Sequence, residues 1–98
     1  MISIAEIRAV AAVVWDHVAQ SENPAQADIE FLDAIAMADK NWHDTLREAN
    51  IFCGGGSEAW KACKHLADRQ QQAEYRAAYK TLEAADDLEF EEMQEAAE

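Results

Sequence analysis

This chain of 98 residues has few cysteines, no long apolar run and no catalytic signature. Two cysteines, Cys53 and Cys63, are too few for a disulfide scaffold, so reduced thiols are expected. No stretch approaches the roughly 20 apolar residues of a membrane span. The N-terminus lacks a basic region followed by an apolar run, which argues against a secretory signal. We therefore expect a cytoplasmic protein that forms a single domain over residues 1–98.

The apolar content of the chain favours a thin core between helices. Hydrophobic residues make up 50% of the sequence, but 21 of them are alanine, which buries little surface. The larger apolar residues suffice for one core and no more. The fold class expected is all-α, a small bundle of three to four helices with an acidic C-terminal tail over residues 86–98. A homodimer or a bound partner could supply further burial.

The charge of the chain is large and unevenly distributed. Twenty acidic residues against eight lysines and arginines give a net charge of −12. Residues 1–39 contribute −6, residues 40–80 contribute +2 and residues 81–98 contribute −8. Such a field repels nucleic acid and anionic membrane surfaces, and it steers the protein toward basic partners. Direct binding to nucleic acid or to a membrane is therefore not expected.

The first helix is expected to begin at a capping box, with Ser3 as the N-cap and Glu6 three residues later. It should end near Ser21. Its apolar residues recur at helical spacing and form one stripe, which predicts that this helix is the most buried of the bundle. The stripe consists of Ile4, Ile7, Ala11, Val14 and Val18, widened by Val10, Val13 and Trp15.

The second helix is expected to open at Asn23, a favoured N-cap, followed by Pro24 at the first helical position. Asp39 falls on its apolar side. Either this carboxylate is buried with a partner, or the helix breaks near residues 39–41 and restarts. Burying an unpaired carboxylate is costly, so the break is the favoured reading.

A loop over residues 53–57 should end the second helix at Gly54, with Ser57 as the cap of the third. The third helix leads into the tail, where seven acidic residues and no base surround Leu88, Phe90 and Met93. Acidic residues at a helix C-terminus oppose the macrodipole. The tail is therefore expected either to fray or to be held by something basic.

No arrangement of residues supports catalysis or metal binding. Cys63 and His65 are two positions apart on a helix and cannot share an ion. Asp39 and His43 share a side, but no second such pair accompanies them. The glycine-rich loop lacks the strand and the lysine of a phosphate loop, so a plain turn is the better reading. We expect no metal, no cofactor and no enzymatic activity, and a thiol or metal enzyme is kept only as a remote third class.

In length, charge, helicity and acidic tail the chain resembles small phage-encoded inhibitors, such as anti-CRISPR proteins and other nucleic-acid mimics. The resemblance is one of type, and no residue role is carried over from it. It implies a phage protein that occupies a basic channel and excludes nucleic acid.

The leading hypothesis is a non-enzymatic acidic protein that docks on a basic protein surface, as an inhibitor of a nucleic-acid-binding complex. The alternative is a helical homodimer with a structural or adaptor role, held by the apolar stripes of the first and third helices. The contact residues expected for the leading hypothesis are Glu30, Asp33, Asp44, Glu48, Asp86, Asp87, Leu88, Glu89, Phe90, Glu91 and Glu92.

Overall fold

The computed structural model describes the backbone of residues 2–97 and the side chains as far as Ala85. It contains three α-helices: α1 (Ile4–Gln20), α2 (Gln26–Cys53) and α3 (Glu58–Ala97). No strand occurs among the described residues, so the expected all-α class is confirmed, and three helices agree with the expected three to four. None of these helices combines the length and hydrophobicity of a transmembrane segment within the described part of the chain.

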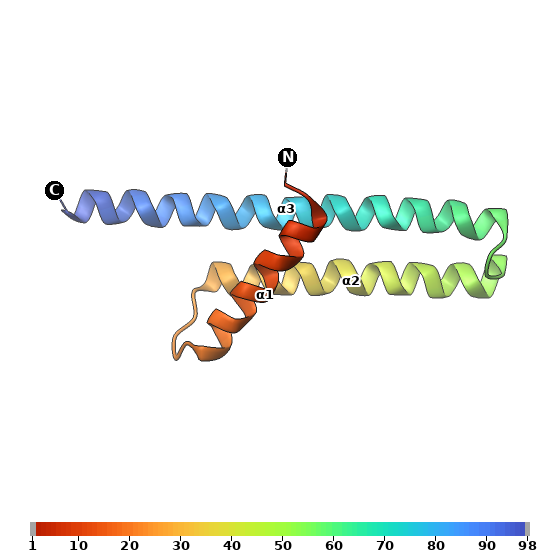
Figure 1. Ribbon diagram of the computed structural model, residues 1–98, viewed down its shortest axis with the longest axis horizontal. Coiled ribbons are helices and arrows are strands. Elements are labelled where there is room, and N and C mark those ends of the chain that lie inside the picture. Colours follow the sequence, from red (N-terminus) through yellow and green to blue (C-terminus); the bar gives the residue numbers. More distant parts are fainter. Residues whose placement is uncertain (1, 98) are drawn as a thin grey trace.

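Helices α2 and α3 form a long antiparallel hairpin (Figure 1). The molecule measures 62 × 28 × 17 Å, and its radius of gyration is 17.4 Å. A compact domain of this length has a radius of gyration of about 13 Å. Helix α3 has 40 residues and α2 has 28, a difference worth about 18 Å of helix. The C-terminal end of α3 therefore projects past the start of α2 (Figure 1).

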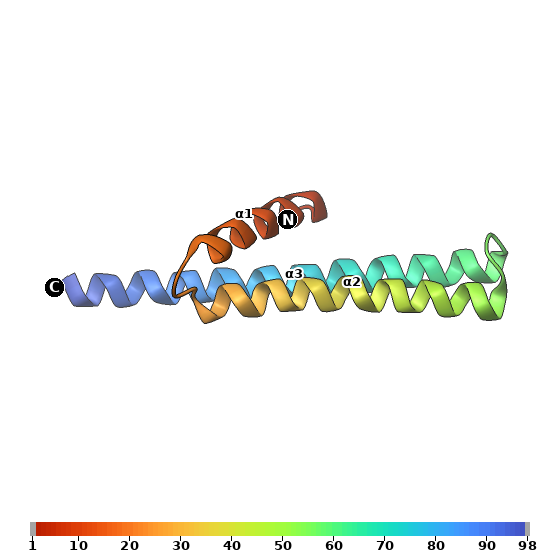
Figure 2. The same cartoon turned by 90° about the horizontal axis from the view of Figure 1, so that it is seen from below.

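Helix α1 crosses obliquely over the hairpin and lies on one side of it (Figures 1 and 2). Its contact with the hairpin centres on Ile7, which is fully buried. Tyr75 of α3 is only 2% exposed and is, with Ile7, the largest fully buried side chain. The core cluster consists of Ile7, Phe31, Ile35, Ala38, Tyr75, Ala78 and Leu82.

The prediction that the first helix is the most buried is wrong. Ile7 is the only buried residue of α1, whereas Val13 is 69% and Trp15 is 62% exposed. Because α1 meets the hairpin from one side and at an oblique angle, only part of its apolar stripe reaches the core. The two long helices supply most of the core instead.

The favoured break in the second helix is also wrong, since α2 is continuous from Gln26 to Cys53. Asp39 remains inside the helix because it is partnered. It accepts hydrogen bonds from the Tyr75 hydroxyl and from Nε2 of Gln71, at 2.9 Å. A carboxylate that accepts two hydrogen bonds avoids the free-energy cost of burying an unpaired charge, which was the reason to expect a break.

The predicted helix ends are confirmed at four of the five places where they were specified. The Ser3 hydroxyl accepts from the backbone N–H of Glu6 at 3.1 Å, and α1 ends just before Ser21. The N-cap of α2, however, is Ala25, without a side-chain cap. Asn23 and Pro24 therefore lie in the preceding turn.

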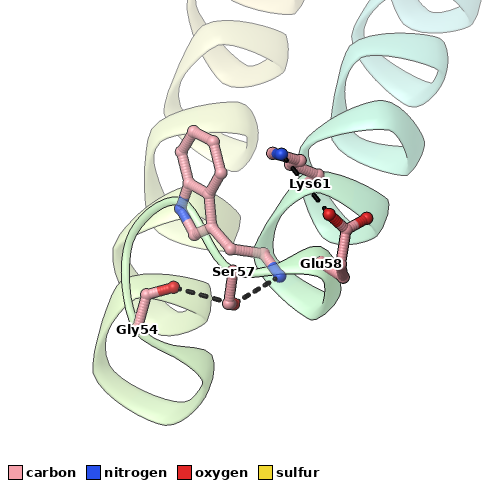
Figure 3. A network of polar contacts seen from close by, with 5 residues as sticks. Gly54, Ser57, Glu58 and Lys61 are labelled. Atoms are coloured by element: carbon pink, nitrogen blue, oxygen red, sulfur yellow. Dashed lines mark hydrogen bonds and ion pairs between the residues drawn. The ribbon is translucent and has the colours of Figure 1, made fainter.

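The loop between α2 and α3 has the predicted form. Gly54 and Gly56 have φ of 76° and 84°, a backbone conformation that favours glycine. The Ser57 hydroxyl accepts a hydrogen bond from the backbone N–H of Trp60 at 3.1 Å and donates one to the carbonyl oxygen of Gly54 at 2.9 Å (Figure 3). Lys61 pairs with Glu58 on the surface beside it (Figure 3). The turn thus caps both helices with its own groups.

The docking of α1 can be tested with a single cavity-forming substitution. Ile7→Ala removes the one fully buried side chain of α1 and should lower the free energy of unfolding by about 2–5 kcal/mol. Urea denaturation followed by circular dichroism measures the change. Val13→Ala on the exposed side of the same helix is the control, with an expected change within about 0.5 kcal/mol. Equal effects of the two substitutions would contradict the described packing of α1.

Candidate functional site

The hairpin brings the two acidic segments of the sequence to the same end of the molecule. We call residues 2–39 and 74–97 the acidic half, and residues 40–73, which include the loop, the loop half. The acidic half holds fifteen carboxylates and three basic residues, for a net charge of −12. The loop half holds four carboxylates and five basic residues, for +1. The molecule is therefore strongly polarised along its long axis.

The four carboxylates predicted as contacts on α2 share one side of that helix but differ in their surroundings. Glu30, Asp33 and Glu48 are exposed, and none of them forms an ion pair among the described residues. Asp44 is paired with Lys40 at 3.0 Å and with Arg47 at 3.6 Å. The hydrogen bond from Lys40 is the main reason that the pKa of Asp44 lies below its usual value. Asp44 is thus the least available of the four.

The predicted contact residues of the tail belong to the C-terminal part of α3, and their side chains lie outside the described residues. They are Asp86, Asp87, Leu88, Glu89, Phe90, Glu91 and Glu92. The backbone places this segment beyond the start of α2, next to the end of the hairpin that carries Glu30 and Asp33 (Figure 1).

A polar cluster joins all three helices at the boundary of the core. Asp39 of α2 accepts from Gln71 and Tyr75 of α3, and the Arg8 guanidinium of α1 lies 5.6 Å from the centre of the Tyr75 ring. Burial raises the pKa of Tyr75 above its usual value near 10, and the bond to Asp39 adds to this rise while Arg8 opposes it. The cluster fixes α2 against α3 in one register.

A second polar link lies one turn nearer to the loop. The indole N–H of Trp42 donates to Asp68 at 2.7 Å, and Lys64 pairs with the same carboxylate at 2.9 Å. Both bonds lower the pKa of Asp68, and the bond from Lys64 has the larger effect. The polar stretch in the middle of α3 therefore contributes partners for α2.

An open groove lies between α2 and α3 in the acidic half. It has a volume of about 420 Å³, and apolar side chains form much of its lining. The charged residues that line it are Glu30 and Glu74. Met37, on its edge, is 55% exposed. The groove thus offers apolar surface together with uncompensated negative charge.

The thiols and histidines do not converge. Cys53 and Cys63 are both free and half-buried, as expected for reduced thiols. Within the described residues, no three His, Cys, Asp or Glu side chains are grouped so that they could hold a metal ion. His43 instead packs edge-on against Trp42, with ring centres 5.0 Å apart.

No protein-family model matches the chain, and neither a curated protein nor a solved structure is significantly similar to it.

Sequence reasoning missed both the groove and the polar cluster. The cluster had a signal, since Gln71 and Tyr75 are four residues apart and share one face of α3. Asp39 on an apolar face required a donor, but the sequence did not state which residue would oppose it. The groove had no such signal in the sequence. Its lining comes from two helices, and their register is defined only by how they pack.

The polar cluster predicts a loss of stability at high pH. Unfolded tyrosine ionises near pH 10, and the folded state holds the Tyr75 pKa higher. The contribution of Tyr75 should be complete below pH 10 and should decrease as the pH rises through the folded pKa. Urea denaturation between pH 8 and pH 11.5 (roughly the range spanning that transition) measures it.

Tyr75→Phe should lower the free energy of unfolding by about 1 kcal/mol at neutral pH, since Asp39 loses a donor. It should also flatten the decline above pH 10. Tyr79→Phe is the control and should keep the decline, because Tyr75 is still present. An unchanged alkaline decline in Tyr75→Phe would show that another group causes it.

Proposed function

We propose that this chain is a non-enzymatic binding protein whose acidic half docks on a basic surface of another protein. The observation that carries the proposal is the polarisation of the molecule, with −12 in one half and +1 in the other. A charge that served only solubility would not need to be gathered at one end. Clustered charge of one sign steers a partner of opposite sign into a defined orientation.

The most concrete form of this function is inhibition of a nucleic-acid-binding complex. Carboxylates one helical turn apart, such as those of Glu30 and Asp33, are separated from each other by about 5–6 Å. That spacing is close to the separation of phosphates along a nucleic-acid strand. An elongated acidic rod of this kind would occupy a basic channel and exclude nucleic acid by steric occlusion. Its affinity should fall as salt screens the charges.

A structural or adaptor role as a homodimer is the second candidate, and one observation favours it. Ile51, Phe52 and Leu66 are large apolar side chains of the loop half, and all three are exposed. Because the loop half is nearly neutral, two copies could meet there without strong repulsion. Light scattering across a range of concentrations distinguishes this role: a stable dimer that ignores basic partners would replace the leading proposal.

The leading proposal is tested by changing the net charge by the same amount in each half of the molecule. The acidic-half variant combines Glu30→Gln, Asp33→Asn, Asp86→Asn and Asp87→Asn, which raises the net charge by four. The loop-half control combines Asn50→Lys, Ala62→Lys, His65→Lys and Gln72→Lys at exposed positions, which also raises it by four. The probe is a labelled oligolysine peptide, titrated by fluorescence anisotropy at low and high salt.

The acidic-half variant should bind oligolysine at least several-fold more weakly than the loop-half control, because clustered charge acts locally. Equal weakening would mean that only total charge matters and would contradict the proposal. For the inhibitory role, a partner protein is isolated by capture on the immobilised chain and is then loaded with labelled nucleic acid. Addition of the wild-type chain should release that nucleic acid. The acidic-half variant should fail to displace it.

A further inference from the structure

The groove between α2 and α3 gives access to apolar side chains of the core within the acidic half. Its deepest residues, Phe31, Ala78 and Leu82, are buried members of the core, so the groove reaches the hydrophobic interior. Ala34 and Ala77 are small exposed residues that leave it open, and Met37 stands exposed at its edge. An open groove with a buried apolar floor can accept the apolar side chains of a binding partner.

The groove lies on the side of the hairpin that α1 leaves free. Its lining residues on α2 recur every three or four positions, from Ala27 through Ala34 to Asn41, and so share one face of the helix. Leu32 and Ile35, which pack in the cluster around Ile7, are displaced around the helix from that face. None of the lining residues comes from α1, which covers one side of the hairpin only (Figure 2).

The charge around the groove has one sign. Glu30 of α2 and Glu74 of α3 both line it, and the only hydrogen bond that each accepts comes from a glutamine one turn earlier. Neither forms an ion pair among the described residues. The basic residues of the same stretch of α3, Arg76 and Lys80, line a separate hollow with Ile2. The groove therefore combines an apolar floor with acidic sides.

We propose that this groove binds a cationic amphipathic helix of a partner protein. The proposal rests on the acidic binding function above and adds the site and the form of the partner. The apolar stripe of the helix would cover Phe31, Met37 and Leu82, and lysines or arginines beside the stripe would pair with Glu30 and Glu74. The lining from Ala27 to Asn41 extends about 21 Å, which is the length of about 14 helical residues.

Charge complementarity selects this occupant over a second copy of the chain. A two-fold contact through the groove would bring the Glu30 and Glu74 carboxylates of both copies together, between molecules that each carry −12. Like charges at a contact oppose association. A cationic helix meets the apolar floor and neutralises both carboxylates at once.

The test uses two fluorescent peptides of about 14 residues with identical composition, half leucine and half lysine. In the amphipathic peptide the leucines fall at helical spacing on one face, and in the scrambled peptide they do not. The amphipathic peptide should bind the wild-type chain at least tenfold more tightly, measured as Kd by anisotropy. Light scattering of the chain alone checks that it does not dimerise through the groove.

Two neutral variants locate the binding. Met37→Gln combined with Ala77→Gln makes the groove polar and should weaken the amphipathic peptide about tenfold. Ile51→Gln combined with Leu66→Gln removes exposed apolar surface elsewhere and should leave its Kd unchanged. Glu30→Gln with Glu74→Gln should weaken it more than Glu48→Gln with Glu58→Gln, which removes two carboxylates outside the groove. Circular dichroism confirms that each variant remains helical.

The outcomes separate this inference from the proposed function. Equal affinity of the two peptides, equal effects of the two apolar variants, or a dimer that the Met37→Gln and Ala77→Gln pair dissociates would overturn the groove as a helix-binding site. Salt-sensitive binding of oligolysine by the acidic half would still support the proposed function. Loss of that binding as well would overturn both.

Discussion

The packing of α2 against α3 is the interaction on which the rest of the molecule depends. Tyr75, buried between the helices, donates its hydroxyl hydrogen to Asp39, and Gln71 donates to the same carboxylate. These directional bonds fix the register of two long helices that hydrophobic contact alone would leave free to slide. Helix α1 adds to this hairpin but does not define it, since Ile7 is its one buried residue.

The register has a direct consequence for the electrostatics. An antiparallel hairpin returns the chain to the end at which it began, so the acidic N-terminal and C-terminal segments become neighbours. The same register brings Glu30 and Glu74 to the lining of one groove, together with the small residues Ala34 and Ala77. Acidic surface and apolar groove are thus two results of one packing arrangement. The proposed docking on a basic protein and the proposed binding of a cationic amphipathic helix therefore refer to the same event.

Local sequence rules are sufficient for the ends of the helices and for the loop. The caps at Ser3 and Ser57 and the glycine loop were predicted correctly, because each depends on residues within one turn. The expected break at Asp39 and the expected burial of α1 were wrong. Both depend on which residues of another helix lie opposite, and helical periodicity does not contain that information. Of the candidate site, the sequence supplied the carboxylates but neither the groove nor the pairing of Asp44.

The sequence by itself determined the all-α class, the glycine loop over residues 53–57, and the excess of negative charge at both ends of the chain. Composition, periodicity and capping fix these properties because they act within a segment. Only the tertiary structure decided that the two acidic ends lie together, that α2 runs unbroken past Asp39, and that a groove opens beside Glu30 and Glu74. The physical reason is that each of these depends on contacts between residues more than 30 positions apart in the sequence.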